Sequence, residues 1–269
     1  MGRPTGWVSA SGSERPKNEL ALRAEARSTQ AVAKYGQFCP VSRGAEVFAE
    51  RWTPLILREL LNGSERFSEL QLGLPRVSRN LLTQRLASLR LAGIIERRRA
   101  TVGRGYTYHL TPAGAALRPA VEALGAWGYQ WAGQEVPRAR LDPVLLMWFI
   151  RRRVRLDALP KRKTIVQFDF SAPRRSFWLR LEPPEVDLCF VDESFDVDLL
   201  VETDVATLTA AWLGRIPLAD AVRQGRIQLE GSAAATRGFA QWFGLSPFAN
   251  GGAERILGTT GAPAPLRAR

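Results

Sequence analysis

The chain has 269 residues, of which 45% are hydrophobic, and a formal net charge of +12, so we expect two domains with apolar cores. No stretch approaches the ~18 continuous apolar residues of a membrane span, and two cysteines are too few for a disulfide framework. The N-terminal residues lack the apolar region of a signal peptide, so we expect a cytoplasmic protein.

The N-terminal part is predicted to be helical only after a disordered start. Residues 1–17 are dominated by Gly, Pro, Ser and charged side chains, which is typical of disorder. Asn18 can cap a helix that runs to about residue 33. Pro40 begins a second helix, in which Val41, Ala45 and Phe48 fall on one stripe.

The stretch from Trp52 to Leu110 has the element order of a winged helix-turn-helix. Glycines and a proline separate its predicted segments. These are a helix over Thr53–Leu61 with a buried stripe at Leu55, Ile56 and Leu60, a short helix from Ser68, a turn at Gly73–Pro75, a polar-faced helix from Ser78 to Gly93 and a hairpin with its tip at Gly103–Gly105.

The polar-faced helix suits the major groove of DNA. Leu82, Leu86 and Leu89 are four and three residues apart and form its inward stripe, so the opposite face is left for contacts. Arg, Asn and Gln can each make two hydrogen bonds to one base edge, and a basic hairpin can contact phosphates. An ordinary solvated helix face is the alternative interpretation. The candidate DNA contacts are Arg51, Ser78, Arg79, Asn80, Thr83, Gln84, Arg97, Arg98, Arg99 and Arg104.

A long helix is predicted from Pro112 to Gln134, before a linker of low order over residues 135–141. An apolar stripe on this helix must be covered by other apolar groups. The stripe packs either within its own domain or, in the interpretation that we favour, on a second subunit. The dimerisation candidates are Leu117, Val121, Leu124, Trp127 and Trp131.

From Leu141 the pattern changes to strands followed by helices, which indicates an α+β domain over residues 141–248. An apolar helix over Pro143–Arg152 leads into four runs of period two. The runs are centred on Phe168, Leu179, Leu188 and Leu199; helices over Asp204–Leu213 and Pro217–Gln224, a strand over Arg226–Glu230 and a helix over Ala233–Phe243 follow. The segment from Ala249 to the end is rich in Gly, Pro and Ala and is predicted to be a flexible tail.

Ordered motifs between Cys39 and Trp131 closely resemble the HxlR family of bacterial transcription regulators. They are Cys39-Pro40-Val41, Arg51-Trp52-Thr53, Ile56-Leu57-Arg58-Glu59-Leu60, Arg66-Phe67-Ser68-Glu69-Leu70, Val77-Ser78, Leu82-Thr83-Gln84-Arg85-Leu86, Gly93-Ile94-Ile95-Glu96-Arg97 and Tyr108-His109-Leu110-Thr111. The resemblance implies a homodimeric winged-helix domain, here 18–134, whose terminal helices form the dimer. The chain departs from the family pattern at Ala49-Glu50, where a glycine is usual, and lacks the usual proline at the wing tip.

Cys39 matches the position at which some relatives sense oxidants or electrophiles. In this interpretation, the helix start and Arg43, four residues further on, favour the thiolate form of Cys39. A semi-buried small residue at an interface is the alternative, and the one that we favour. Cys189, on a predicted strand, is expected to be inert.

The segments Val205–Leu208, Trp212–Gly214, Pro217–Ala221 and Gly225–Gly231 resemble a sterol-carrier-protein-type domain. In that family, helices over an open antiparallel or mixed sheet enclose an apolar tunnel for hydrophobic molecules. The same aromatic and aliphatic residues also serve as the core of any α+β domain. The candidate pocket residues are Trp148, Phe149, Phe168, Phe170, Trp178, Leu188, Phe190, Leu199 and Trp212.

Catalysis and metal binding are not expected. His109 is the only histidine, and Asp192, Glu193, Asp196 and Asp198 have the spacing of a solvated loop rather than of a metal site. We therefore expect no enzyme activity and no cofactor.

The leading hypothesis is a homodimeric regulator that binds double-stranded DNA and whose second domain either responds to a hydrophobic small molecule or mediates assembly. The charge distribution favours it: residues 1–140 hold 21 Lys and Arg against 11 Asp and Glu, whereas residues 141–269 hold 17 against 15. A hydrophobic-ligand carrier whose winged helix serves protein contacts, and a thiol-based redox regulator acting through Cys39, are the alternatives.

Overall fold

The computed structural model describes residues 35–101, 103–132 and 136–257, which fall into two units that divide between Glu50 and Arg51. The predicted disorder of residues 1–17 and the predicted helix of residues 18–33 lie outside the described part of the chain. Residue 135 of the predicted linker and residues 258–269 of the predicted tail also lie outside it.

The first unit contains helix α2 (Pro40–Phe48). As predicted, Pro40 stands in its first turn, where a missing backbone N–H costs nothing. The backbone N–H of Tyr35 donates to the Glu46 carboxylate at 3.0 Å, which ties the preceding segment to this helix. Val41 of α2 and Phe38, which precedes the helix, are 77% and 97% exposed, so this unit leaves apolar side chains uncovered in the described chain.

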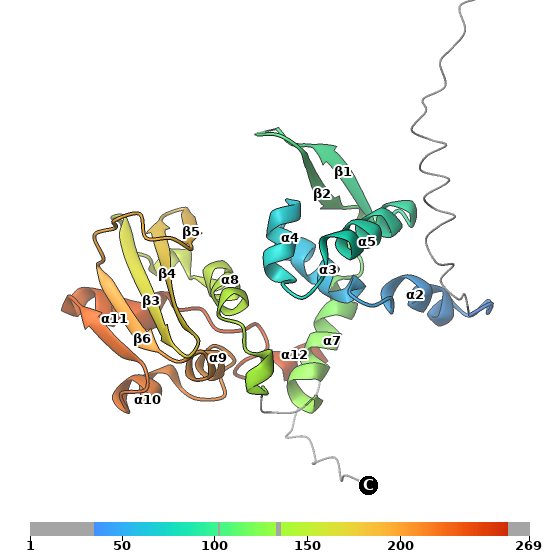
Figure 1. Cartoon of the computed structure of the whole chain (residues 1–269). Helices are drawn as coiled ribbons and strands as arrows, with labels where there is room; N and C mark the ends of the chain where they lie inside the picture. The colour runs from blue at the N-terminus through green and yellow to red at the C-terminus, as the bar shows by residue number, and fades with distance from the viewer. Residues whose placement is uncertain (1–34, 102, 133–135, 258–269) are drawn as a thin grey trace, which may run out of the picture. The chain divides into compact units, whose positions relative to one another are not determined.

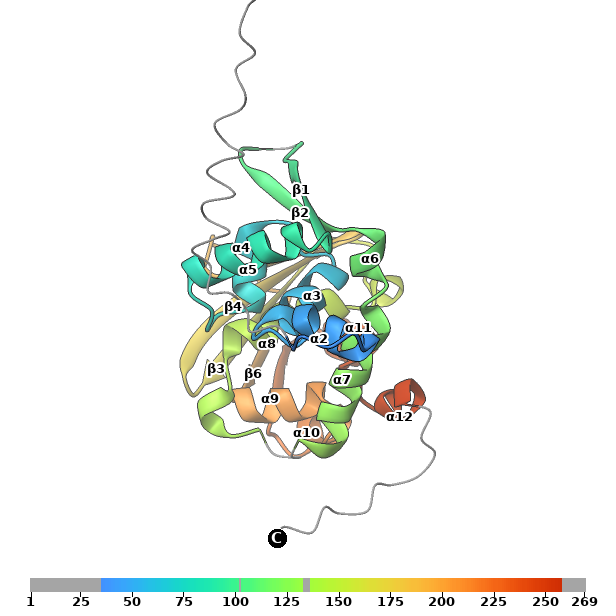
Figure 2. The same ribbon diagram turned by 90° about the vertical axis from the view of Figure 1, so that its right-hand side faces the viewer.

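The second unit begins with the predicted winged helix-turn-helix (Figures 1 and 2). Its core is built from buried Ile56, Leu57, Leu70, Leu82 and Leu86. The elements are α3 (Thr53–Leu61), α4 (Phe67–Gly73), α5 (Arg79–Leu91), β1 (Ile95–Arg99), β2 (Tyr106–Leu110), α6 (Pro112–Ala115) and α7 (Arg118–Trp131).

Two details of this part differ from the sequence-based prediction. Leu55 is 38% exposed, because the buried stripe of α3 contains Leu57 in its place. Over its described residues, the predicted helix from residue 112 to residue 134 forms two helices, since α6 ends at Ala115 and Leu117 is the N-cap of α7. Residues 133–134 lie outside the described part of the chain. Pro119, in the first turn of α7, has no N–H for a continuous helix and favours a new start there.

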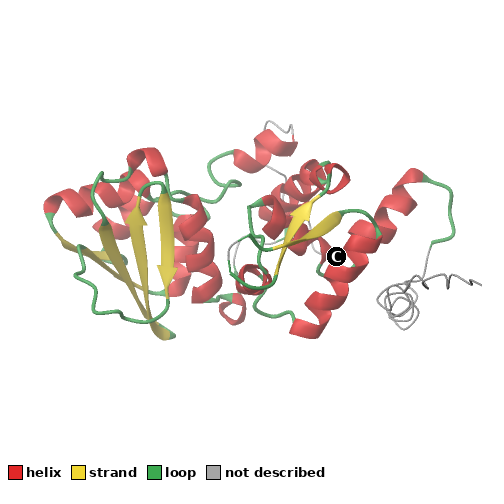
Figure 3. Ribbon diagram, turned by 90° about the horizontal axis from the view of Figure 1, so that it is seen from above, coloured by secondary structure: helices red, strands yellow, loops and turns green. Residues whose placement is uncertain are grey.

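The rest of the second unit is a mixed sheet with helices, one of the two sheet types expected. The strand order is β5-β4-β3-β6-β7, in which only β3 and β6 are parallel neighbours. Figure 3 shows the strands in yellow and the helices in red. The elements are η1 (Arg138–Arg140), α8 (Pro143–Arg153), η2 (Leu156–Ala158), β3 (Thr164–Ser171), β4 (Arg174–Glu182), β5 (Glu185–Cys189), β6 (Leu199–Thr203), α9 (Val205–Trp212), α10 (Leu218–Arg223), β7 (Gln228–Gly231), α11 (Ala233–Trp242) and α12 (Gly252–Leu257).

The predicted alternation of the strands gives the sheet one buried face. Val166, Phe168 and Phe170 of β3 are buried in the same core as Phe239 of α11. Because successive side chains of a strand point to opposite faces, Gln167 and Asp169 lie on the other, partly exposed face.

Helix α12 lies within the region that was predicted to be a flexible tail. Its Ala253 is buried, and a Cβ on Gly125 of α7 would lie only 2.3 Å from Cζ of Phe248, so the two segments are in close contact. The Tyr129 hydroxyl of α7 also donates to the carbonyl of Leu213 at 2.9 Å. One side of α7 is therefore covered by the chain's own C-terminal residues, which supplies the apolar contacts that keep α12 folded.

Among the described residues, no helix combines the length and the apolar character that crossing a membrane requires.

Candidate nucleic-acid interface

Helix α5 is positioned by its cap and by its leucines. The Ser78 side chain accepts a hydrogen bond from the backbone N–H of Leu81 at 3.2 Å, as expected of an N-cap serine. Leu82, Leu86 and Leu89 are buried, as their spacing predicted. The opposite side of the helix is consequently held towards solvent.

That outward face carries the predicted reading residues. Arg79, Asn80, Thr83 and Gln84 are all exposed. The Thr83 hydroxyl donates to the Arg79 carbonyl at 2.9 Å, and the Arg79 guanidinium lies 5.7 Å from the centre of the Phe67 ring. Within the described residues, the amides of Asn80 and Gln84 have no intramolecular hydrogen-bond partner and are available to a ligand.

Strands β1 and β2 form the wing, which extends beyond α5 (Figures 1 and 2). Arg97 lies over the Tyr106 ring at 4.0 Å, and Arg98 forms an ion pair with Glu96. Arg99 and Arg104 are exposed and make no ion pair within the part of the chain that the structure describes. The wing therefore presents two cationic side chains that form no ion pair among the described residues.

The wing is fixed to the start of α4 through backbone groups. The Glu69 carboxylate accepts the N–H groups of Glu65 and Arg66 at 2.8 and 3.0 Å. The N–H of Tyr108 in β2 donates to the Glu65 carbonyl at 2.8 Å. These contacts orient the hairpin relative to the helices. His109 is half-buried on β2, as predicted, and its Nε2 lies 2.8 Å from the Thr107 hydroxyl.

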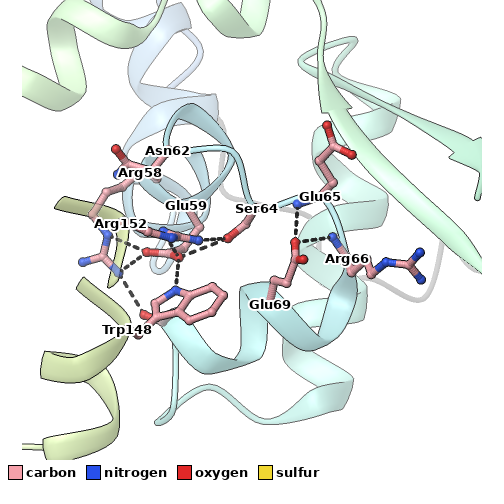
Figure 4. A network of polar contacts seen from close by, with 10 residues as sticks. Arg58, Glu59, Asn62, Ser64, Glu65, Arg66, Glu69, Trp148 and Arg152 are labelled. Atoms are coloured by element: carbon pink, nitrogen blue, oxygen red, sulfur yellow. Dashed lines mark hydrogen bonds and ion pairs between the residues drawn. The ribbon is translucent and has the colours of Figure 1, made fainter. Parts of the chain in front are cut away.

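Behind this surface lies a polar network that the sequence did not reveal, centred on the fully buried carboxylate of Glu59 (Figure 4). Its Oε2 atom accepts hydrogen bonds from Trp148 Nε1 at 3.1 Å, Arg152 Nη1 at 2.8 Å and Ser64 Oγ at 3.3 Å. Its Oε1 atom accepts one from Arg58 Nε at 3.0 Å. Burial lowers the pKa of the Arg152 guanidinium, and the neighbouring Glu59 opposes that shift.

One sequence signal could have pointed to this site. Glu59 stands within an apolar stretch at helical spacing from Ile56, so the spacing that buries Ile56 also buries the carboxylate. A buried charge requires partners. Nothing in the sequence identified those partners, because Trp148 and Arg152 lie about ninety residues further along the chain.

The structure places the remaining predicted residues as follows. In the dimerisation stripe, Leu124 and Trp127 are 47% and 53% exposed, and Leu117, Val121 and Trp131 are half-buried. Cys39 is the half-buried N-cap residue of α2. Arg51 is exposed and lies over the Trp52 ring at 5.4 Å.

The nine candidate pocket residues are spread over several places. Trp148 belongs to the Glu59 network, Phe149 stacks on Trp212 at 5.4 Å, and Trp178 lies on the outer face of the sheet, 6.5 Å from the ring of Phe195. Phe190 lies just after β5 and contacts Phe177, whereas Phe168 and Leu188 pack in or against the core.

Phe170 and Leu199 each line one of two hollows in the sheet region. The hollow at Phe170 is polar and has a volume of about 590 Å³. The hollow at Leu199 has a volume of about 330 Å³ and lies between η2, the start of β3 and α11; Trp242, Ala235 and Gly238 are among its walls.

The remaining titratable groups offer little chemistry. Burial raises the pKa of the Cys189 thiol, which disfavours the reactive thiolate. Within the described ranges, no three His, Cys, Asp or Glu side chains converge as a metal site.

Comparison with known proteins was consistent with the winged-helix geometry. Residues 47–136 match the family model for the HxlR-like helix-turn-helix. The uncharacterized HTH-type transcriptional regulator YvaP of Bacillus subtilis is 37% identical over 98 residues, which are 35% of this chain and 90% of the relative. A second uncharacterized HTH-type regulator, sll1512 of Synechocystis, is 34% identical over 101 residues, covering 37% of this chain and 75% of the relative.

A solved structure is also similar to this chain. The crystal structure of PA1607 is 33% identical and aligns with a TM-score of 0.35 over 38% of this chain and 70% of that protein. The family model matches this chain, and the chain spans 90% and 75% of two relatives to which it is 37% and 34% identical. The chain therefore belongs to the HxlR-like helix-turn-helix family.

Proposed function

We propose that this protein is a transcriptional regulator that binds specific DNA sequences as a homodimer. The observation that carries the proposal is the outward face of α5, where the amides of Asn80 and Gln84, beside an exposed Arg79, have no hydrogen-bond partner among the described residues. Amide and guanidinium groups read adenine and guanine edges in the major groove. Arg99 and Arg104 on the wing, together with Arg51, Arg97 and Arg98, supply contacts to the flanking phosphates. The HTH-type regulators to which this chain is similar support the same function.

The homodimer is supported by the apolar side chains that the described chain leaves uncovered on α7. One side of this helix packs against the chain's own Phe248 and α12, whereas Leu124 and Trp127 remain about half exposed. Apolar groups of this size gain free energy when a second surface removes them from water. In the proposed dimer, two copies of α5 would read half-sites about 34 Å apart on one side of the duplex.

The residues after the linker form the second proposed domain, 141–248, which we propose to be a sterol-carrier-like sensor of a small hydrophobic molecule. The hollow of about 330 Å³ beside Leu199 is within the usual size of a ligand site, and its walls include Leu159, Val166 and Trp242. A ligand there would replace water along these apolar side chains. Of the nine pocket candidates, Leu199 lines this hollow.

The test is selection of duplexes from a randomised pool by the full-length chain, followed by fluorescence anisotropy with the selected duplex. We expect Asn80→Ala and Gln84→Ala each to weaken discrimination between the selected and an unrelated duplex by about 1–3 kcal/mol. Ser88→Ala is a matched control, because this half-buried serine of α5 donates to the Gln84 carbonyl within the helix. Failure of the wild type to enrich any sequence would contradict the proposal.

A further inference from the structure

We infer that Arg152 and Trp148, which lie in the sheet-containing region, are positioning residues for the proposed DNA-reading helix and act through the buried carboxylate of Glu59. The inference rests on the proposed function for its DNA readout. It adds a specific physical claim: part of the support for the helix-turn-helix comes from α8, outside the family-matched residues 47–136.

The first step concerns the hydrogen-bond partners that the buried carboxylate of Glu59 requires. Its side chain has no exposed surface, so the carboxylate can exchange none of its protein partners for water without a local opening. A buried charge that loses one partner destabilises the site strongly, because the remaining charge stays desolvated. Two of its four hydrogen-bond donors, Trp148 Nε1 and Arg152 Nη1, come from α8.

The second step connects this carboxylate to the turn before α4. Ser64, in the middle of the α3–α4 connection, is buried and donates to Glu59 Oε2. Arg152 Nη2 donates to the same Ser64 hydroxyl, so one guanidinium holds both the carboxylate and the connection (Figure 4). Movement of Arg152 would therefore disturb two points of the helix-turn-helix at once.

The third step leads to the start of α5. Arg58, the second cation on Glu59, also donates from Nη2 to the carbonyl of Gly73 at 2.9 Å. Gly73 is the last residue of α4, and a side-chain donor, Gln71 Nε2, bonds the carbonyls of Leu74 and Val77 in the turn that follows. That turn ends at Ser78, the N-cap of α5.

Together these contacts form a continuous set from α8 to the beginning of α5. Arg58 adds an aromatic contact, since its guanidinium lies 4.9 Å from the centre of the Phe149 ring on α8, and Phe149 stacks on Trp212 of α9. Two cations therefore link the position of α8 to Glu59: Arg152, which lies on α8 itself, and Arg58 of α3, which contacts Phe149 of α8. A shift of α8, whatever causes it, would change the setting of the reading helix.

The experiment compares Arg152→Gln with Arg153→Gln in the full-length chain. Both variants remove one positive charge from the same helix, but Arg153 is exposed and its Nε faces the carbonyl of Leu245, 3.4 Å away. Anisotropy titrations at one salt concentration use a duplex selected by the wild type and an unrelated duplex. We expect Arg152→Gln to weaken binding of the selected duplex by about 5- to 150-fold, the usual range of coupling between sites, and to affect the unrelated duplex much less. Arg153→Gln should leave the ratio of the two affinities unchanged.

Two further variants separate positioning from loss of fold. Trp148→Phe keeps an aromatic ring but removes the N–H donor to Glu59 Oε2, so it should shift the affinity ratio in the same direction with an intact circular dichroism spectrum. The double variant Glu59→Gln with Arg152→Gln removes the buried charge together with its partner and should recover part of the lost ratio. Equal affinity ratios for Arg152→Gln, Trp148→Phe and the wild type, in folded proteins, would overturn the inference.

Backbone hydrogen exchange provides a readout that needs no DNA. Arg152→Gln should accelerate exchange of the amides from Ser64 to Leu82 relative to Arg153→Gln. If the wild type selected no duplex, the proposed function would fail, and this measurement would still decide the inference. Unchanged exchange in that segment would reject the positioning role.

Discussion

Gly73 and Glu59 are in such close contact that a Cβ on Gly73 would lie 2.0 Å from Glu59 Oε2. Gly73 does not need its conformational freedom, because its φ is not positive; it needs the missing side chain. We expect Gly73→Ala to lower the free energy of unfolding by about 1–3 kcal/mol, the usual cost of overpacking a filled site.

Chemical denaturation of the full-length chain measures this effect. Gly238→Ala in α11 is the matched control, since the nearest atom to its Cβ would be Trp242 Cδ1 at 3.9 Å, an ordinary contact. That control should be neutral or stabilising by up to about 1 kcal/mol, because alanine favours the helix more than glycine does. A Gly73→Ala variant as stable as Gly238→Ala would show that the Glu59 carboxylate can move away at no cost.

The arginines of the wing are expected to contribute unequally to the salt dependence of DNA binding. Arg99 and Arg104 have no internal ion pair in the described residues, whereas Arg98 is paired with Glu96. If the first two contact phosphates, Arg99→Gln and Arg104→Gln should each reduce the slope of log affinity against log salt by about 0.9. Titrations of one duplex at four salt concentrations measure the slope. We expect Arg98→Gln to change it less, and equal changes for all three variants would contradict the role of the internal pair.

The proposed dimer predicts the effect of a charge on α7. Trp127→Glu should convert the dimer to a monomer, because a carboxylate in place of a half-exposed indole would have to be desolvated at the interface. Sedimentation equilibrium gives the mass directly. Val191→Glu is the control, since Val191 is 70% exposed in the sheet-containing region and lies outside the proposed interface. Equal masses for Trp127→Glu and the wild type would argue against this face of α7.

The free energy of unfolding is expected to depend on pH through Asp204. Burial alone would raise the pKa of this N-cap carboxylate, but hydrogen bonds from the Thr207 side chain and from the backbone N–H groups of Thr207 and Ala206 outweigh it, so the pKa lies below its usual value. A lowered folded-state pKa gives stability that is present above the unfolded-state pKa, about 3.9, and is lost as the pH falls through the folded-state pKa.

Asp204→Ala should therefore cost about 0.5–2 kcal/mol at pH 7, the usual cost of a lost cap. The difference from the wild type should narrow as the pH falls below about 4. Urea unfolding at pH 7 and pH 3 measures both values. Asp204→Asn retains the capping oxygen and should cost less than Asp204→Ala at pH 7; a difference between Asp204→Ala and the wild type that widened at pH 3 would contradict the assignment.

Local patterns were sufficient to predict most of the elements. The spacing of Leu82, Leu86 and Leu89 fixed the inward side of α5, and Ser78 marked its start, because both signals depend only on helical geometry. The alternation around Phe168 and Leu179 predicted two strands of the sheet in the same way. The break before α7 was missed, since the apolar spacing continues across Leu117 and concealed the effect of Pro119.

The sequence by itself determined which side chains of α5 and of the wing face outward, because that choice is made by periodicity within one segment. Only the tertiary structure decided that Trp148 and Arg152 would meet Glu59, and that Phe248 would cover one side of α7. The physical reason is that a buried charge or an apolar face specifies the kind of partner it needs, and leaves the partner's position in the chain to the packing of the whole molecule.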